Sequence, residues 1–294
     1  MNEQEFLKAR LRELSSRAYQ RDILQHTAFL GMSEQAVFLE HQKEFTGTSY
    51  CLYGGHEEAE RRVIAFLPSY IELPPAETEG GADKEADGEA DRKANRKADG
   101  AADRKAALFS DIIACVRIRP RNEKFSDALT HRDYLGALMN LGIEREKLGD
   151  ILTDGTEAYL FCMADIAPYL CENLNKVRHT SVSCEQIAAE ACGMHPQYEE
   201  LSVNVASERL DAVISAVWKL SRGISAELIA GEKVFVDGKT ARQAGSGIPQ
   251  GTRVSVRGYG KFIYEGAERE TKKGRLYVRV RRFADCRNFQ REKQ

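Results

Sequence analysis

The chain has 294 residues, of which 42% are hydrophobic, so it is long enough for two or three domains with ordinary cores. No stretch approaches the ~18 apolar residues of a membrane helix, and Met1-Asn2-Glu3 does not open a signal peptide. The seven cysteines form no C-x-x-C pair, and the fragment Cys192-Gly-Met-His195 lacks a second pair of metal ligands. We therefore expect a cytoplasmic protein with free thiols, no metal, no cofactor and no membrane partner.

Charge is distributed unevenly along the chain. Residues 207–294 hold 19 lysines and arginines and 10 acidic residues, a net charge of +9, whereas the whole chain carries −2 and residues 1–206 therefore −11. A folded basic region of this size usually faces a polyanion. Because no amphipathic membrane helix accompanies it, the pattern favours nucleic acid.

The first half predicts two structured regions around one unusual segment. Residues 1–46 form an N-terminal helical region, and 47–185 form a small α+β domain that opens with a strand at 48–53, a Gly54-Gly55 turn and a helix over 57–66 ended by Pro68. Residues 76–107 consist almost entirely of Ala, Asp, Glu, Lys, Arg and Gly, which predicts a disordered or loosely helical insertion in that domain.

The rest of the α+β domain has clearer local signals. We expect a buried strand at 111–118, a hairpin turning at Asp154-Gly155, and a strand at 179–184. Thr130 and Asp133 indicate a capping box at the start of a helix. His131 and Arg132 in its first turn are candidates for a second RNA surface, although exposed polar residues are common at helix starts.

After a linker at 186–206, the basic region at 207–283 predicts two helices on a small sheet, followed by a basic tail at 284–294. Leu210, Val213 and Val217 form the buried stripe of the first helix, and Ser221 is the N-cap of the second. A helix start flanked by Lys219 and Arg222 combines unpaired backbone N–H groups with positive charge, which suits a phosphate backbone. The candidate RNA-binding residues are Arg209, Asp211, Lys219, Ser221, Arg222, Lys233, Lys239, Arg257, Tyr259, Lys261 and Phe262.

Tyr259 and Phe262 are candidates for stacking on an exposed base, with packing beneath the loop as the equal alternative. The sequence contains no phosphate-binding glycine loop, nucleophile elbow or metal-ligand spacing, so we assign no catalytic residue and expect a protein that is not an enzyme.

These residues resemble the S4 RNA-binding domain at Arg209-Leu-Asp211, Ser221-Arg222, Leu228-Ile229, Gly231, Val234 and Gly238, with departures at Ser225 and Asp237. Further segments resemble the YlmH family, also called RqcP: Gly54-Gly-His-Glu-Glu-Ala-Glu-Arg-Arg62, Thr130–Gly142, Arg145-Glu-Lys-Leu-Gly-Asp150 and Arg257-Gly-Tyr-Gly-Lys-Phe262. The resemblance implies an α+β fold with an N-terminal helical region, an RRM-like α/β sandwich and a C-terminal S4 domain of the αL type.

The resemblance also implies a function. Proteins of this family bind the large ribosomal subunit carrying an obstructed peptidyl-tRNA and assist the quality-control factor that tails stalled chains with alanine. We therefore expect a monomer whose partners are 23S rRNA, peptidyl-tRNA and that factor. Two alternatives stay open: an RNA-modifying enzyme of the S4-containing pseudouridine synthase type, and an interaction scaffold linked to cell division.

Overall fold

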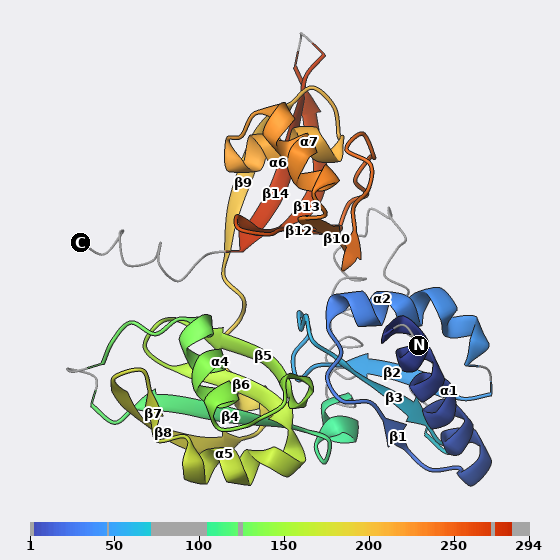
Figure 1. Ribbon diagram of the computed structural model, residues 1–294, viewed down its shortest axis with the longest axis vertical. Coiled ribbons are helices and arrows are strands. Elements are labelled where there is room, and N and C mark those ends of the chain that lie inside the picture. The colour runs from blue at the N-terminus through green and yellow to red at the C-terminus, as the bar shows by residue number, and fades with distance from the viewer. Residues whose placement is uncertain (1–2, 46, 72–104, 123–125, 272–273, 284–294) are drawn as a thin grey trace, which may run out of the picture. The chain divides into compact units, whose positions relative to one another are not determined.

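A computed structural model of the chain describes residues 3–45, 47–71, 105–122, 126–271 and 274–283 (Figure 1). The predicted insertion, except its last three residues, and the predicted basic tail lie outside these ranges. The chain divides into two compact units, Met1–Gly31 with Val37–Met194, and Met32–Ala36 with His195–Gln294. Within the described ranges, no helix has the length and apolar character needed to cross a bilayer.

The first unit begins with a three-stranded antiparallel sheet in the order β1-β3-β2. The N-terminal region comprises α1 (Glu3–Arg21), β1 (Gln25–His26), α2 (Met32–His41), β2 (Ser49–Tyr53) and β3 (Val63–Leu67), and the first five residues of α2, Met32–Ala36, belong to the second unit. Leu11 of α1 and Phe38 of α2 pack on Ile64 and Phe66 of β3. The helix predicted over 57–66 is therefore wrong. All five residues of β3 are buried. Because the run is apolar throughout, its sequence shows neither the 3.6-residue period of a helix nor the two-residue period of a strand.

Another sheet in this unit is antiparallel and five-stranded, in the order β5-β6-β4-β8-β7. In chain order its region comprises β4 (Ile113–Pro120), α4 (His131–Asn140), β5 (Leu148–Thr153), β6 (Ala158–Met163), α5 (Ala167–Asn173), β7 (Lys176–Val177) and β8 (Thr180–Ile187). The predicted strand, helix and hairpin of this region are confirmed. The middle region thus starts at β4, because β2 and β3 pair with β1 and not with this sheet.

Both faces of the five-stranded sheet are covered. Helices α4 and α5 lie over one face, where Val116, Leu160 and Leu170 are fully buried (Figure 1). On the other face, Cys115 and Phe161 pack in one cluster with Phe29 and Val63 of the N-terminal region. The side of the sheet away from its helices is therefore core and not an open surface.

The second unit contains an antiparallel six-stranded sheet in the order β11-β10-β12-β13-β14-β9, with two helices on one face (Figure 1). Its elements are β9 (Tyr198–Val205), α6 (Leu210–Trp218), α7 (Arg222–Ala230), β10 (Val234–Val236), β11 (Lys239–Thr240), β12 (Arg253–Val256), β13 (Gly260–Glu270) and β14 (Leu276–Phe283). The predicted linker is wrong at its end, since residues 198–205 form the edge strand β9 along the full length of β14.

Candidate nucleic-acid interface

One buried carboxylate joins the starts of the two helices of the second unit. Asp211, in the first turn of α6, is only 6% exposed. Arg209 donates to its two oxygens from Nε and Nη2, each at 3.1 Å, and Nη2 of Arg222 lies 3.7 Å from Oδ2. The two arginine side chains are nevertheless 48% and 54% exposed. Because a guanidinium has five N–H donors, each arginine retains donors for a second acceptor.

The start of α6 uses its own backbone donors within the protein. The N–H groups of Leu210 and Asp211 donate to the carbonyls of Ser246 and Ala244 at 2.9 and 3.0 Å. Gly245 lies between these two acceptor residues and next to the Arg209 side chain. A Cβ at this position would come within 3.4 Å of the Arg209 guanidinium, so the glycine keeps the space for it. An anion at this end of α6 would therefore meet the Arg209 side chain and not the helix backbone.

The start of α7 is different, because its first backbone donors are not used. Ser221 is the N-cap, as predicted, and its hydroxyl accepts the Ile224 N–H at 3.2 Å. The N–H groups of Arg222 and Gly223 have no partner within the described ranges, and both residues are exposed. Unpaired N–H groups at the positive end of a helix dipole, next to a guanidinium, form a favourable place for a phosphate oxygen.

A buried hydrogen bond holds the two helices together below these starts. The hydroxyls of Ser215 and Ser225 lie 2.9 Å apart, and the two also bond to the carbonyls of Asp211 and Ser221 at 2.7 and 3.3 Å. Ser225 is fully buried, so its hydroxyl has partners in place of water. The contact between the two helices therefore accommodates a serine hydroxyl inside the core.

The structure does not bring all the predicted residues to one surface. Val254, Val256 and Phe262 point toward the helices, so Arg257 and Lys261, which alternate with them, lie on the opposite face of the sheet. Phe262 is fully buried, so for this residue the alternative of packing is confirmed and its place among the RNA-binding candidates is wrong. Lys233 and Lys239 are exposed, one before β10 and the other on β11.

Tyr259 remains on the surface next to the end of α6. Its side chain is 41% exposed, and its ring centroid lies 6.3 Å from that of Trp218, the last residue of α6. The following residue, Lys219, ends the helix in the left-handed conformation and is exposed. Tyr259 thus has the position and the free area that a stacking residue needs.

The capping box of α4 is confirmed. The Asp133 carboxylate accepts the Thr130 N–H at 2.9 Å and the Thr130 hydroxyl at 2.7 Å. His131 and Arg132 are exposed in the first turn, as predicted. Arg178 lies 3.6 Å from the Asp133 carboxylate, so a third basic residue adjoins this helix start.

Residues 113–191 match the family model described as "Putative RNA-binding domain in YlmH". "Ribosome-associated protein quality control protein P2" of Bacillus subtilis (strain 168) is 31% identical over 165 residues, which cover 55% of this chain and 64% of that relative. The resemblance to the YlmH family is confirmed. The match with the Bacillus subtilis protein covers less than two thirds of that protein's length. A solved structure, "Cell division protein ylmH from Streptococcus pneumoniae", shares 20% identity at a TM-score of 0.42, over 64% of this chain and 92% of its own.

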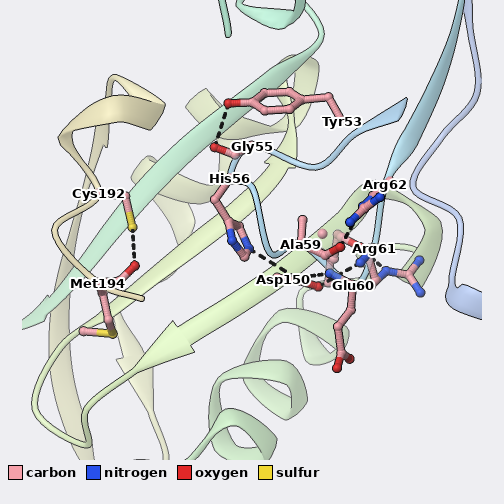
Figure 2. A network of polar contacts seen from close by, with 12 residues as sticks. Tyr53, Gly55, His56, Ala59, Glu60, Arg61, Arg62, Asp150, Cys192 and Met194 are labelled. Atoms are coloured by element: carbon pink, nitrogen blue, oxygen red, sulfur yellow. Dashed lines mark hydrogen bonds and ion pairs between the residues drawn. The ribbon is translucent and has the colours of Figure 1, made fainter. Parts of the chain in front are cut away.

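Two of the YlmH-like motifs meet in one polar network, shown in Figure 2. Asp150 accepts the backbone N–H groups of Glu60 and Arg61 at 2.7 and 3.1 Å and lies 3.3 Å from His56 Nε2. Arg61 donates in turn to the carbonyls of Leu148 and Phe29 at 2.7 and 2.8 Å. The Gly54–Arg62 and Arg145–Asp150 segments therefore fasten the three-stranded sheet to the five-stranded one.

The glycines of these YlmH-like motifs are required by close packing. A Cβ on Gly55, where φ is +97°, would lie 2.1 Å from the Phe161 ring, and one on Gly54 would lie 2.3 Å from the Arg61 carbonyl oxygen. Both the space and the backbone conformation at Gly55 thus exclude other residues.

We expect Gly55→Ala to destabilise the first unit by about 2–4 kcal/mol through overpacking and backbone strain. Gly136→Ala is the matched control, because a Cβ there meets nothing within 4 Å and the residue lies inside α4. That control should gain about 0.5–1 kcal/mol from helix propensity. Urea denaturation followed by circular dichroism measures both, and equal stability of the two variants would contradict the packing argument.

Proposed function

We propose that this chain is an RNA-binding factor of ribosome-associated quality control that grips a phosphate backbone at the starts of α6 and α7. The observation that carries the proposal is the Asp211 carboxylate, which orients Arg209 and Arg222 while leaving both about half exposed. A guanidinium that is already oriented loses less conformational entropy on binding a phosphate than a freely rotating guanidinium does. The unpaired N–H groups at the start of α7 add donors at the same place.

Residues 198–283 are proposed to be an S4-type RNA-binding domain. The helix pair, the Ser221 cap and the arginines at 209 and 222, which belong to the motif resemblance, support this assignment. The net charge of +9 on residues 207–294 would attract RNA over a distance and make the affinity fall with salt.

Residues 113–187 are proposed to be RRM-like. Their order is strand, helix, two strands, helix and two strands, the first of the last two being the two-residue β7, and β4 is the middle strand of the sheet with β6 and β8 on either side. RRM domains stack bases on the sheet face away from the helices, but here that face is filled by Phe161 and its neighbours. We infer that this domain contacts RNA at the start of α4, through His131 and Arg132.

The quality-control role rests on the name of the Bacillus subtilis relative. By extension we propose that the chain acts in the cytoplasm without catalysing a reaction, on the large ribosomal subunit. Its contacts there would be 23S rRNA and peptidyl-tRNA, and it would assist the factor that adds alanine tails. An oriented cationic surface fits a factor that holds RNA in place.

Co-sedimentation with purified large ribosomal subunits tests this proposal. The variant Lys219→Asn/Arg222→Gln removes two cations near the start of α7, with asparagine chosen because Lys219 is left-handed. We expect it to lose most of its ribosome binding. The control Arg269→Gln/Arg279→Gln removes the same charge from the β13–β14 hairpin and should bind like the wild type. Undiminished binding of the first variant would exclude the proposed contact.

A further inference from the structure

The six-stranded sheet of the second unit has a second chemically distinctive face. Both helices described between residues 198 and 283 pack on Val254, Phe262 and Val280. The alternating residues of the same strands point the other way. They include three half-buried aromatic side chains, Tyr198, Phe235 and Phe283, which contribute to neither the helix-side core nor the interface described above.

These aromatic residues lie in a single row across the sheet. Phe235 pairs with Ser255, and Ser255 pairs with Lys261. Because Phe262 pairs with Arg282, the neighbours Lys261 and Phe283 are also side by side, and Phe283 pairs with Tyr198. Five adjacent strands thus place Phe235, Ser255, Lys261, Phe283 and Tyr198 in line, spanning about 19 Å at the usual strand spacing.

Cations lie over every ring of this row. The Arg257 guanidinium is 5.5 Å from the Phe235 centroid, and the Arg281 guanidinium is 4.9 Å from that of Tyr198. Over Phe283 lie Arg253 at 5.6 Å and the Lys261 ammonium at 5.9 Å. Two carboxylates adjoin Arg281: Glu265 forms an ion pair with it at 2.7 Å, and Glu200 is the residue of β9 that pairs with Arg281 across the strands. The four groups that lie over the rings, Arg253, Arg257, Lys261 and Arg281, are all cationic side chains.

We propose that this face, defined by Tyr198, Phe235, Phe283 and the cations over them, is a second RNA-binding surface that takes unpaired bases. Aromatic rings and guanidinium planes on a sheet are platforms on which bases stack, while the positive charges draw in the phosphates between them. The first surface, at α6 and α7, offers oriented cations for a backbone and only Tyr259 for stacking. The two faces would thus divide the recognition of a folded RNA between its backbone and its exposed bases.

The cations over the rings argue for RNA over a protein partner or a membrane as the occupant of this face. A protein partner would be expected to bury the rings beneath apolar side chains, but here each ring already carries a cation that such burial would have to desolvate. A membrane surface would engage long apolar side chains, of which the row has none beyond its rings. Charge complementarity with a flexible polyanion is the remaining fit.

The test compares two RNA probes on the full chain. One is a fluorescein-labelled 12-nucleotide adenosine strand, and the other is a 12-base-pair RNA duplex without loops. The variant Tyr198→Leu/Phe283→Leu keeps apolar bulk and all charges but removes two rings. We expect it to bind the single strand about tenfold or more weakly, from the usual contribution of stacking, and the duplex as the wild type does.

The matched control is Tyr277→Leu. Tyr277 also lies on this face, under the Arg269 guanidinium at 4.4 Å, but six residues further along β14 from Phe283. The Tyr277→Leu variant should bind the single strand and the duplex as the wild type does. Thermal melting should show that all variants fold. Unaltered single-strand binding of the double variant would overturn the proposal, as would an equal loss for both probes or binding of anionic vesicles in place of RNA.

This inference stands apart from the function proposed above. If the surface at α6 and α7 does not bind RNA, the Lys219→Asn/Arg222→Gln variant keeps its duplex affinity. If only the sheet face is wrongly assigned, the duplex affinity still falls in that variant while Tyr198→Leu/Phe283→Leu has no effect on the single strand.

Discussion

Replacing Asp150 by alanine is expected to lower the free energy of unfolding of the first unit by about 3–5 kcal/mol. The carboxylate accepts the N–H groups of Glu60 and Arg61 and contacts His56, in a region where its own side chain is only 14% exposed. Removing it leaves those donors without an acceptor away from bulk water. Hydrogen exchange of the amides of β3 and β5 measures the loss within this unit.

The exposed Asp111 supplies the matched control, because Asp111→Ala removes the same group from the surface. It should change the stability by no more than about 0.5 kcal/mol. If Asp150→Ala were equally harmless, the network in Figure 2 would not hold the two sheets together.

The same carboxylate predicts how stability responds to acid. Burial by itself raises the pKa of Asp150, but hydrogen bonds from His56, Glu60 and Arg61 outweigh it, and the pKa lies below its ordinary value. Folding therefore favours the ionised form, and the stabilisation is complete above the ordinary pKa and is lost as the pH falls through the folded one. Between pH values of about 5 and 2, wild-type stability should fall more steeply than that of Asp150→Asn, and parallel curves would contradict this.

Replacing Asp211 by asparagine is expected to weaken the binding of structured RNA about tenfold, although it makes the basic domain more positive. Counting charges alone predicts tighter binding, since a negative charge near the proposed phosphate site is removed. The structure predicts the reverse, because Asp211 orients Arg209 and Arg222 through their guanidiniums. A fluorescence titration with a structured tRNA at fixed salt distinguishes the two.

Asp237→Asn is the control for this change. Asp237 is an exposed carboxylate in the same domain, with φ at +45°, a conformation that asparagine accepts readily. It should bind RNA as well as the wild type or slightly better. Tighter binding by Asp211→Asn would mean that the carboxylate only repels RNA and positions nothing.

Local signals in the sequence were sufficient wherever a few adjacent residues decide the structure. Thr130 and Asp133 predicted a helix start, Asp154-Gly155 a hairpin, and Ser221 a cap, because each acts through its own backbone neighbourhood. The helix predicted over 57–66 is wrong because Val63–Phe66 belong to a strand whose side chains are buried on both faces of a sheet. A strand buried on both faces shows no alternation.

The candidate site depended on sheet geometry that the sequence could not fix in advance. Arg257 and Lys261 stand close to Tyr259 in the chain, yet strand alternation places them on the face away from α6 and α7. Strand β9 did have a signal, since Leu201, Val203 and Val205 alternate with polar residues, and recognising it would have moved the domain start to residue 198. The role of Asp211 needed three-dimensional contacts, because its partner Arg222 lies eleven residues away.

The salt dependence of RNA binding tests the central claim most directly. The logarithm of the affinity for a structured RNA should fall linearly with the logarithm of salt concentration, by about 0.9 per phosphate contacted in a duplex. For Lys219→Asn/Arg222→Gln we predict a slope shallower by about 2, with the control Arg269→Gln/Arg279→Gln keeping the wild-type slope. Identical slopes for all three proteins would show that RNA is not held at the start of α7.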